Sequence, residues 1–184
     1  VGMQAQYVIE DLADVPVRVE LASEFRYRKM SLLPSSLVIL ISQSGETADT
    51  LAALRLAKEK GVKNLAVVNV VGSSIAREAD TVLYTLAGPE ISVATTKAYS
   101  AQLIAMDCLA VKFAQVRRGT EVGKYVEELA SIPKKIEKIL EEKERIQWFA
   151  SKVANKKDIF FIGRGIDYAV GLEGSLKLKE VSYI

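Results

Sequence analysis

The sequence predicts an α/β fold, a three-layer α-β-α arrangement in which a doubly wound parallel sheet lies between two layers of helices. Along the first 120 residues, short apolar runs rich in β-branched side chains alternate with segments of helical periodicity. This alternation favours a parallel sheet, since a right-handed crossover through each helix brings the next strand back in the same direction. The runs show little polar alternation, which indicates strands that are buried on both faces.

The first elements along the chain are a helix and two strands. Residues 2–13 have a helical pattern that ends at Asp14-Val15-Pro16. Residues 17–21 alternate between apolar and polar side chains and predict a strand. Residues 37–41 form an apolar run that is typical of a buried parallel strand.

The remaining elements of the first unit continue the alternation. Residues 47–60 predict an amphipathic helix, and residues 65–70 predict another buried strand. A short helix through Arg77 and a strand over residues 81–85 follow, and a long apolar helix then runs from about residue 95 to 118. The inner side of the amphipathic helix is expected to carry Leu51, Leu54 and Leu56.

The chain divides into three parts. Residues 1–120 form the first α/β domain, and residues 121–156 form a helical connector without strand signals. A new strand is predicted over residues 158–162, followed by a helix from about Ala169, so residues 157–184 are expected to begin a second α/β domain that is cut short. The chain opens with a helix where a doubly wound unit usually opens with a strand, so the first strand is expected to be missing.

Composition excludes several classes of function. The net charge of +2, from 25 basic and 23 acidic residues, is too small for a nucleic-acid-binding protein, and no basic stripe alternates with aromatics. The Lys-rich stretch 132–145 mixes both signs at helical spacing, which indicates a solvated helix face. The apolar runs are far shorter than the roughly 20 residues that span a bilayer, and no signal peptide opens the chain, so a cytoplasmic protein without a membrane partner is expected.

The cysteine and histidine counts restrict the chemistry further. The single cysteine, Cys108, lies in an apolar run and is expected to be a thiol of the core rather than a nucleophile. The absence of histidine excludes a Ser-His-Asp triad, a His-ligated zinc site and a histidine general base within this chain. Acid–base chemistry must therefore use Glu, Asp, Lys or Tyr, and neither a metal site nor a cofactor is predicted.

A hydroxyl-rich loop follows the first buried strand. Ser42, Ser44 and Thr47 offer three hydroxyl donors, Gln43 adds an amide, and Gly45 lets main-chain N–H groups approach an anion. The first turn of the next helix adds unpaired N–H groups and a partial positive charge. The loop lacks the lysine of a P-loop, so a single phosphate group is the better match than a triphosphate with magnesium. The alternative is that Ser44 or Thr47 only caps the helix.

A second polar segment, residues 88–97, leads from the strand 81–85 into the long helix. Its position in the topology places it at the same edge of the sheet as the hydroxyl-rich loop. Val93 and Thr95 are candidates to offer a backbone carbonyl and a hydroxyl to a sugar. An ordinary helix cap at Thr95 or Thr96 is the alternative.

Three charged residues line one face of the last helix. Glu173, Lys177 and Glu180 stand at positions i, i+4 and i+7, with apolar residues on both sides of the stripe. A carboxylate in a semi-enclosed site can serve as a general base, so the stripe is a candidate catalytic face. The alternative, favoured on spacing alone, is an exposed ladder of ion pairs, each stabilising the helix by about 0.3–0.5 kcal/mol.

Four stretches together resemble the isomerase region of the glucosamine-6-phosphate synthases, also called glutamine–fructose-6-phosphate aminotransferases, a family that contains sugar isomerase (SIS) domains. They are residues 22–28 (ASEFRYR), 42–50 (SQSGETADT), 93–99 (VATTKAY) and 172–180 (LEGSLKLKE). The resemblance covers essentially the whole chain in order. It implies a five-stranded parallel sheet between helices, similar to flavodoxin and Rossmann folds, that occurs twice in the complete enzyme.

The resemblance also implies a role for each candidate residue. Fructose 6-phosphate and glucosamine 6-phosphate are the implied ligands, and the sugar phosphate would be held by Ser42, Gln43, Ser44 and Thr47. Val93 and Thr95 would contact the sugar, where the family more often has Ser at the latter position. Glu180 matches the base of the ketose-to-aldose isomerisation, and Glu173 and Lys177 match its neighbours, with Lys177 associated with ring opening.

Parts of the family pattern are absent from this sequence. They include a Cys-Gly-Thr-Ser loop, a catalytic histidine, a Schiff-base lysine and the glutaminase domain. The resemblance therefore implies an enzyme fragment that depends on the glutaminase domain of the complete, homodimeric enzyme. The alternatives are a phosphosugar-sensing SIS module without catalysis and a nucleotide-binding domain, and the latter is disfavoured because no Gly-x-Gly-x-x-Gly motif follows a strand.

Overall fold

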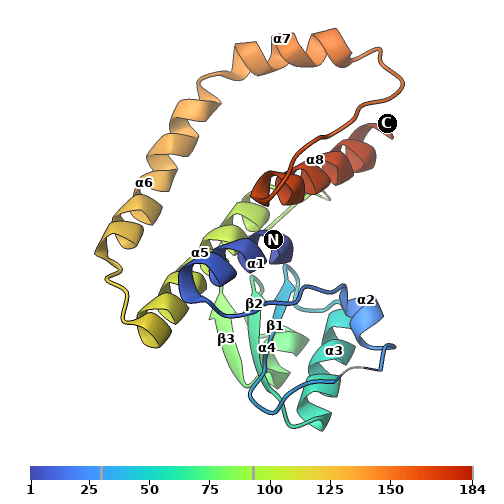
Figure 1. The fold of residues 1–184 in the computed structure, drawn as a ribbon. Helices are drawn as coiled ribbons and strands as arrows, with labels where there is room; N and C mark the ends of the chain where they lie inside the picture. Colours follow the sequence, from blue (N-terminus) through green and yellow to red (C-terminus); the bar gives the residue numbers. More distant parts are fainter. Residues whose placement is uncertain (30, 93, 184) are drawn as a thin grey trace.

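A computed structural model describes residues 1–29, 31–92 and 94–183 and shows helices on both faces of a parallel sheet (Figure 1). The sheet has three strands in the order β1 (Leu37–Ser42), β2 (Lys63–Val68) and β3 (Thr81–Tyr84). Both pairs are parallel, and Ser42, Val68 and Tyr84 lie side by side at their carboxyl ends. The predicted α/β class is confirmed, although the described residues form three of the five strands that the resemblance implies.

Four helices cover the two faces of the sheet. On one face lie α3 (Ala48–Glu59) and α4 (Ser74–Glu78), which are the crossovers between the strands. On the other face lie α1 (Gly2–Ala13) and α5 (Lys97–Arg118) (Figure 1). The short helix α2 (Ala22–Phe25) packs against α3.

Each face of the sheet has its own hydrophobic core, because successive strand residues point to opposite faces. On the α1 and α5 side, Val67 packs with Ile9 and Met106. On the α3 and α4 side, Val68 packs with Leu54 and Ile75, and all three side chains are fully buried. This double burial explains why the strands are apolar throughout.

Two predicted strands are wrong. Residues 17–21 are not a strand, because side chains of α1 bind the backbone at Val17: Gln6 Nε2 donates to its carbonyl, and its N–H donates to Glu10 Oε1, both at 2.9 Å. Residues 158–162 also have no strand structure, since no described strand lies beside them to pair with. A strand needs the backbone of a neighbour, and an apolar sequence alone does not supply one.

The prediction for Cys108 is also wrong. Cys108 is exposed, whereas Met106, Ala110 and Ala114 of the same helix are buried. The buried positions recur at the spacing of one helix face, and Cys108 lies on another face of α5.

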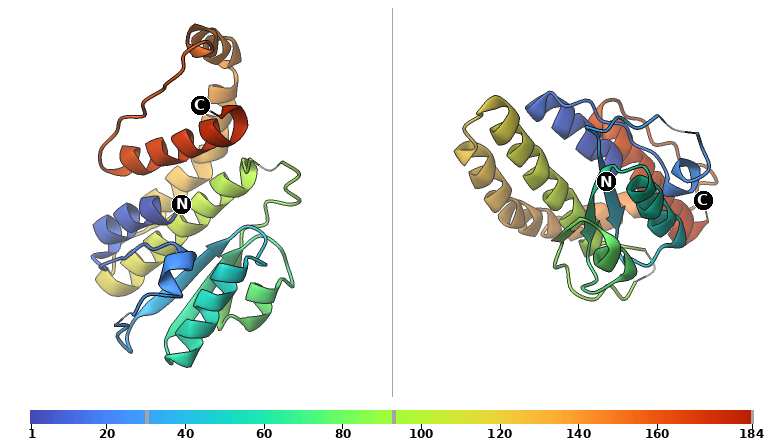
Figure 2. Two further views of the ribbon diagram at one scale, coloured as in Figure 1. Left: turned by 90° about the vertical axis from the view of Figure 1, so that its right-hand side faces the viewer. Right: turned by 90° about the horizontal axis from the view of Figure 1, so that it is seen from below.

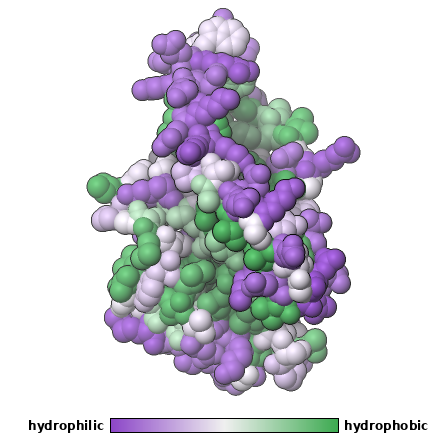
Figure 3. Space-filling view, turned by 90° about the vertical axis from the view of Figure 1, so that its left-hand side faces the viewer, coloured by the Kyte–Doolittle hydropathy of each residue, from purple (hydrophilic) through white to green (hydrophobic). Residues whose placement is uncertain are grey.

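Residues 121–156, predicted as a helical connector, contain two helices that extend away from the sheet (Figure 1). They are α6 (Gly123–Leu140) and α7 (Lys143–Val153), and none of their residues is buried. Figure 3 shows mainly hydrophilic side chains at the top of the molecule, where this arm lies, and apolar patches among hydrophilic side chains on the body below. None of the described helices is both long and apolar enough to cross a membrane.

The last helix, α8 (Ile166–Ser182), returns from the arm and packs against α1 (Figures 1 and 2). Phe161 leads into it and lies against Gly174, where a Cβ atom would come within 2.9 Å of the phenyl ring. The contact with α1 brings α8 back to the first unit of the chain, more than 100 residues after β1 has ended.

Candidate functional site

A cavity of about 230 Å³ lies where the carboxyl end of β1 meets the helices α5 and α8. Ser42 and Gln43 line it from the hydroxyl-rich loop, Thr95 lines it from the segment before α5, and Glu173 and Lys177 line it from α8. The structure thus brings together residues from all three predicted segments. Ser44, Thr47 and Glu180 lie outside the lining, and Val93 lies outside the described residues.

The hydroxyl-rich loop is held by its own hydrogen bonds. The buried hydroxyl of Ser42 accepts the main-chain N–H of Gly45 at 3.0 Å and lies 3.3 Å from Thr47 Oγ1. The hydroxyl of Ser44 accepts the N–H of Glu46 at 3.2 Å. These contacts fold the backbone of residues 42–47 back upon itself at the start of α3.

The side chain of Thr47 does not cap α3. Thr47 is the residue before the helix, yet its hydroxyl makes no capping hydrogen bond and lies next to the Ser42 hydroxyl instead. A purely structural capping role for Thr47 therefore has no support from the geometry. An anion at this loop would meet both hydroxyls and the unpaired N–H groups of the first turn.

Gly45 is required by a close contact as well as by its backbone conformation. Its φ angle is +67°, and a Cβ atom at this position would lie 2.1 Å from Ser73 Oγ. Ser73 precedes α4 and is buried, and its hydroxyl has no hydrogen-bond partner among the residues that the structure describes. The loop thus packs directly on the start of α4.

Asn69 joins the two loops beside the site, and the sequence analysis missed it. Its N–H donates to the carbonyl of Gln43 at 3.2 Å, and its side chain donates to the carbonyl of Gly88 at 2.8 Å. Its side-chain oxygen accepts hydrogen bonds from the Thr85 hydroxyl and the Ala87 N–H. The sequence signal that could have found Asn69 is a polar residue close to the end of an apolar run, because a polar side chain that is buried there needs polar partners.

Glu90 caps the helix α5, which the sequence analysis also missed. Its carboxylate accepts the N–H of Ala98 at 3.3 Å. Thr96 is the residue before the helix, but its side chain makes no capping hydrogen bond. Thr95 is partly buried and lines the cavity.

The charged residues of α8 pair with one another, and two of them, Glu173 and Lys177, line the cavity. Lys177 Nζ donates to Glu180 Oε2 at 2.6 Å and lies 3.8 Å from Glu173 Oε1. The hydrogen bond to Glu180 raises the pKa of Lys177 above its usual value, so the lysine is protonated. The two interpretations of this stripe, a ladder of ion pairs and a face that borders a site, therefore both describe the same face of α8.

Tyr99 adds a polar group to the wall of the cavity. Its hydroxyl donates to Oε1 of the buried Gln4 at 2.9 Å and so connects α5 to α1. Burial and the negative charge of Glu173 raise the pKa of Tyr99, which keeps the phenol protonated at neutral pH. No group of His, Cys, Asp and Glu side chains suited to a metal ion occurs among the residues that the structure describes.

Comparison with known proteins gives one family. A family model described as the SIS domain matches residues 1–112. Curated relatives named glutamine–fructose-6-phosphate aminotransferase [isomerizing] are 60% identical in Clostridium tetani and 50% identical in Pseudomonas putida. In both cases the match covers 100% of this chain, and the chain spans 31% of the relative's length.

Solved structures agree with this family. The C-terminal domain of glucosamine-fructose-6-phosphate aminotransferase from Francisella tularensis has a TM-score of 0.96 at 42% identity, covering 100% of this chain and 53% of that one. Glucosamine-6-phosphate deaminase from Thermotoga maritima has a TM-score of 0.75 at 25% identity, covering 98% of this chain and 54% of that one.

Proposed function

Because the chain belongs to the SIS domain family, we propose that it binds a phosphosugar and forms part of the isomerase region of a glutamine–fructose-6-phosphate aminotransferase. The observation that carries this proposal is the shared cavity, in which a hydroxyl-rich loop and a pair of opposite charges lie together. The curated relatives with this name match the chain over its whole length.

The loop 42–47 is the proposed phosphate site. The Ser42, Ser44 and Thr47 hydroxyls, the Gln43 amide and the first turn of α3 supply hydrogen-bond donors that suit a dianion. Binding the phosphate fixes the sugar at a point remote from its reacting carbons, which orients them without taking part in the chemistry. Val93 and Thr95 are the proposed contacts to the sugar itself.

Glu180 is the proposed base, with Lys177 and Glu173 as its neighbours. In the complete enzyme, fructose 6-phosphate opens its ring, and ammonia from glutamine forms an imine at C2 with loss of water. A carboxylate then removes a proton from C1, and a proton is returned at C2 to give the aldose, glucosamine 6-phosphate. The C1 proton is acidic because it lies next to the imine carbon, so one positioned carboxylate can remove it.

Lys177 connects this base to the cavity. Glu180 lies outside the lining, but the ammonium group of Lys177 binds it at 2.6 Å and itself lines the cavity. We further propose that the chain works in the cytoplasm, in a homodimer, with ammonia supplied by the glutaminase domain.

A calorimetric titration of the complete protein with fructose 6-phosphate, glucose 6-phosphate and a nucleotide tests the binding part. We expect Ser44→Ala combined with Thr47→Ala to weaken phosphosugar binding by at least about 100-fold, because two hydrogen bonds to a charged group are lost. Ser131→Ala combined with Ser151→Ala removes two hydroxyls from the arm and is the matched control. Tighter binding of the nucleotide than of either phosphosugar would reject the proposal.

Glu180→Gln tests the catalytic part and separates an enzyme from a phosphosugar sensor. In the complete enzyme we expect isomerisation to fall by a factor of about 10² to 10⁴, with glutamine hydrolysis retained. Glu128→Gln, which alters an exposed ion pair on α6, is the control. A Glu180→Gln enzyme that forms product at the normal rate would remove Glu180 from the mechanism and favour the sensing module.

A further inference from the structure

Glu46 occupies an unusual place for an acidic residue. It stands between Gly45 and Thr47 in the proposed phosphate loop, yet it is exposed and does not line the cavity. A carboxylate beside an anion site repels the anion, so its presence there needs a physical reason.

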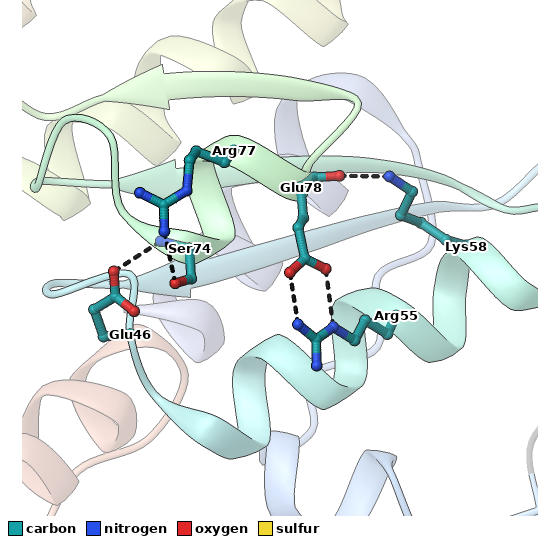
Figure 4. Close-up of polar contacts among 6 residues, drawn as sticks. All are labelled: Glu46, Arg55, Lys58, Ser74, Arg77 and Glu78. Carbon is teal, nitrogen blue, oxygen red and sulfur yellow. Dashed lines mark hydrogen bonds and ion pairs between the residues drawn. The ribbon is translucent and has the colours of Figure 1, made fainter.

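The carboxylate of Glu46 binds the start of α4. Its Oε1 atom accepts the main-chain N–H of Ser74 at 2.8 Å, and the carbonyl of Gly45 accepts the N–H of Ile75 at 3.0 Å. Two successive loop residues therefore bind two successive amides in the first turn of the helix. Figure 4 shows Glu46 pointing toward Ser74 and Arg77.

The helix α4 is a fixed support for the loop. Ile75 is fully buried in the core between the sheet and α3, so the first turn of α4 cannot shift without disturbing that core. Arg77 donates to the Ser74 hydroxyl at 3.2 Å and to the carbonyl of Gly72. The contact between Gly45 and Ser73 leaves the loop no free space on this side.

The negative charge of Glu46 is compensated where it binds. Hydrogen bonding to Ser74 lowers the pKa of Glu46, with a further contribution from the positive charge of Arg77. The carboxylate is thus ionised at neutral pH, and its charge is directed to α4.

We propose that Glu46 is a positioning residue for phosphate, which holds the backbone of residues 44–47 against α4 so that the loop's amides and hydroxyls converge on one anion. This inference rests on the proposed function, because it concerns the same loop. Glu46 touches neither substrate nor reacting atoms and acts through its neighbours Gly45 and Thr47.

The hydrogen bond can be removed from either side. Glu46→Ala deletes the acceptor, whereas Glu46→Gln keeps an oxygen that can accept. Ser74→Pro deletes the donor, and proline is well tolerated there because Ser74 is the first residue of α4 and Ser73 before it has an extended conformation (φ −61°, ψ 161°). Ser74→Ala keeps the N–H and serves as its control.

The affinity of the complete protein for glucose 6-phosphate, measured by calorimetry, is the first readout. We expect Glu46→Ala and Ser74→Pro each to weaken binding by about three- to tenfold, the effect of one charge-assisted hydrogen bond. The double variant should be no weaker than either single one, since both remove the same contact. Glu46→Gln and Ser74→Ala should stay within about twofold.

A control variant and a second readout separate a positioning role of Glu46 from a general loss of stability. Glu78→Ala removes an acidic residue from the same helix, where Glu78 pairs with Arg55 and its carbonyl accepts Lys58 (Figure 4). We expect this control to leave the affinity unchanged. In turnover by the complete enzyme, Glu46→Ala should raise KM for fructose 6-phosphate and leave kcat near normal, the sign of a contact that aids ground state and transition state equally.

The outcomes are distinguishable. Equal affinities of Glu46→Ala and the unsubstituted protein would overturn this inference and leave the proposed function intact. The same holds if Glu78→Ala weakens binding as much as Glu46→Ala, or if the double variant loses the sum of both effects. Failure of the unsubstituted protein to bind any phosphosugar would overturn the proposed function and this inference together.

Discussion

Replacing Gly45 with alanine tests how tightly the loop packs on α4. Gly45 and Gly61 have the same φ angle of +67°, at opposite ends of α3, but their surroundings differ. A Cβ atom on Gly45 would lie 2.1 Å from Ser73 Oγ and 2.6 Å from Ser73 Cβ, whereas a Cβ atom on Gly61 would meet nothing within 4 Å. The two substitutions therefore share backbone strain and differ in the steric clash.

The expected losses of stability follow from these contacts. Left-handed backbone costs an alanine about 1–2 kcal/mol, so Gly61→Ala should lower the free energy of unfolding by about that amount. Forcing an extra methyl group into a packed site costs about 1–3 kcal/mol more. We therefore expect Gly45→Ala to lower the free energy of unfolding by about 2–5 kcal/mol.

Urea unfolding followed by far-ultraviolet circular dichroism measures both losses, provided that the slope of the free energy against urea stays unchanged. Ser73→Gly removes both clashing atoms and no hydrogen bond, because the Ser73 hydroxyl has no partner within the described part of the chain. In the Ser73→Gly background, Gly45→Ala should cost only about as much as Gly61→Ala. Equal losses for Gly45→Ala and Gly61→Ala in the native background would refute the proposed close packing.

Three further predictions concern the core, the loops and pH. Leu54→Ala should lower the free energy of unfolding by about 2–5 kcal/mol in urea titrations, since Leu54 is fully buried; a loss below about 1 kcal/mol would contradict that burial. Asn69→Ala should weaken phosphosugar binding in calorimetry, because it releases the Gly88 carbonyl and the Ala87 N–H that hold the loop after β3; unchanged affinity would show that this loop has no part in the site. Burial raises the pKa of the Asp107 carboxyl in the folded protein, which favours its protonated form. The folded protein therefore loses stability as the pH rises through that pKa. Asp107→Asn should therefore raise the melting temperature at pH 7, with the gain vanishing below about pH 4, and an equal gain at both pH values would contradict this cause.

Local signals predicted the helices and the buried strands well. The helix over residues 2–13 was predicted with its observed bounds, because its end is encoded nearby by Asp14-Val15-Pro16. The strands β1, β2 and β3 were predicted to within two residues, since each is an apolar run between polar loops. The same signals wrongly predicted strands over residues 17–21 and 158–162. A strand forms only where a neighbouring strand can pair with it, and that neighbour is distant in sequence.

The candidate site shows the same division between local and distant information. The loop 42–47 and the stripe on α8 each carry a pattern of their own, so both could be selected from the sequence. That they share one cavity depends on the docking of α8 on α1, which no local pattern encodes. Tyr99 and Asn69 were missed because their roles come from partners on other elements, Gln4 and Gly88.

The position of α8 at the far end of the chain has a consequence for synthesis on the ribosome. The three strands that the structure describes, together with α1 through α5, have been translated more than 40 residues before α8 is complete. Nascent domains generally fold in the order in which they emerge. The half of the candidate site that contains the loop 42–47 is therefore expected to fold first, and the charged half on α8 to dock on a surface that is already folded.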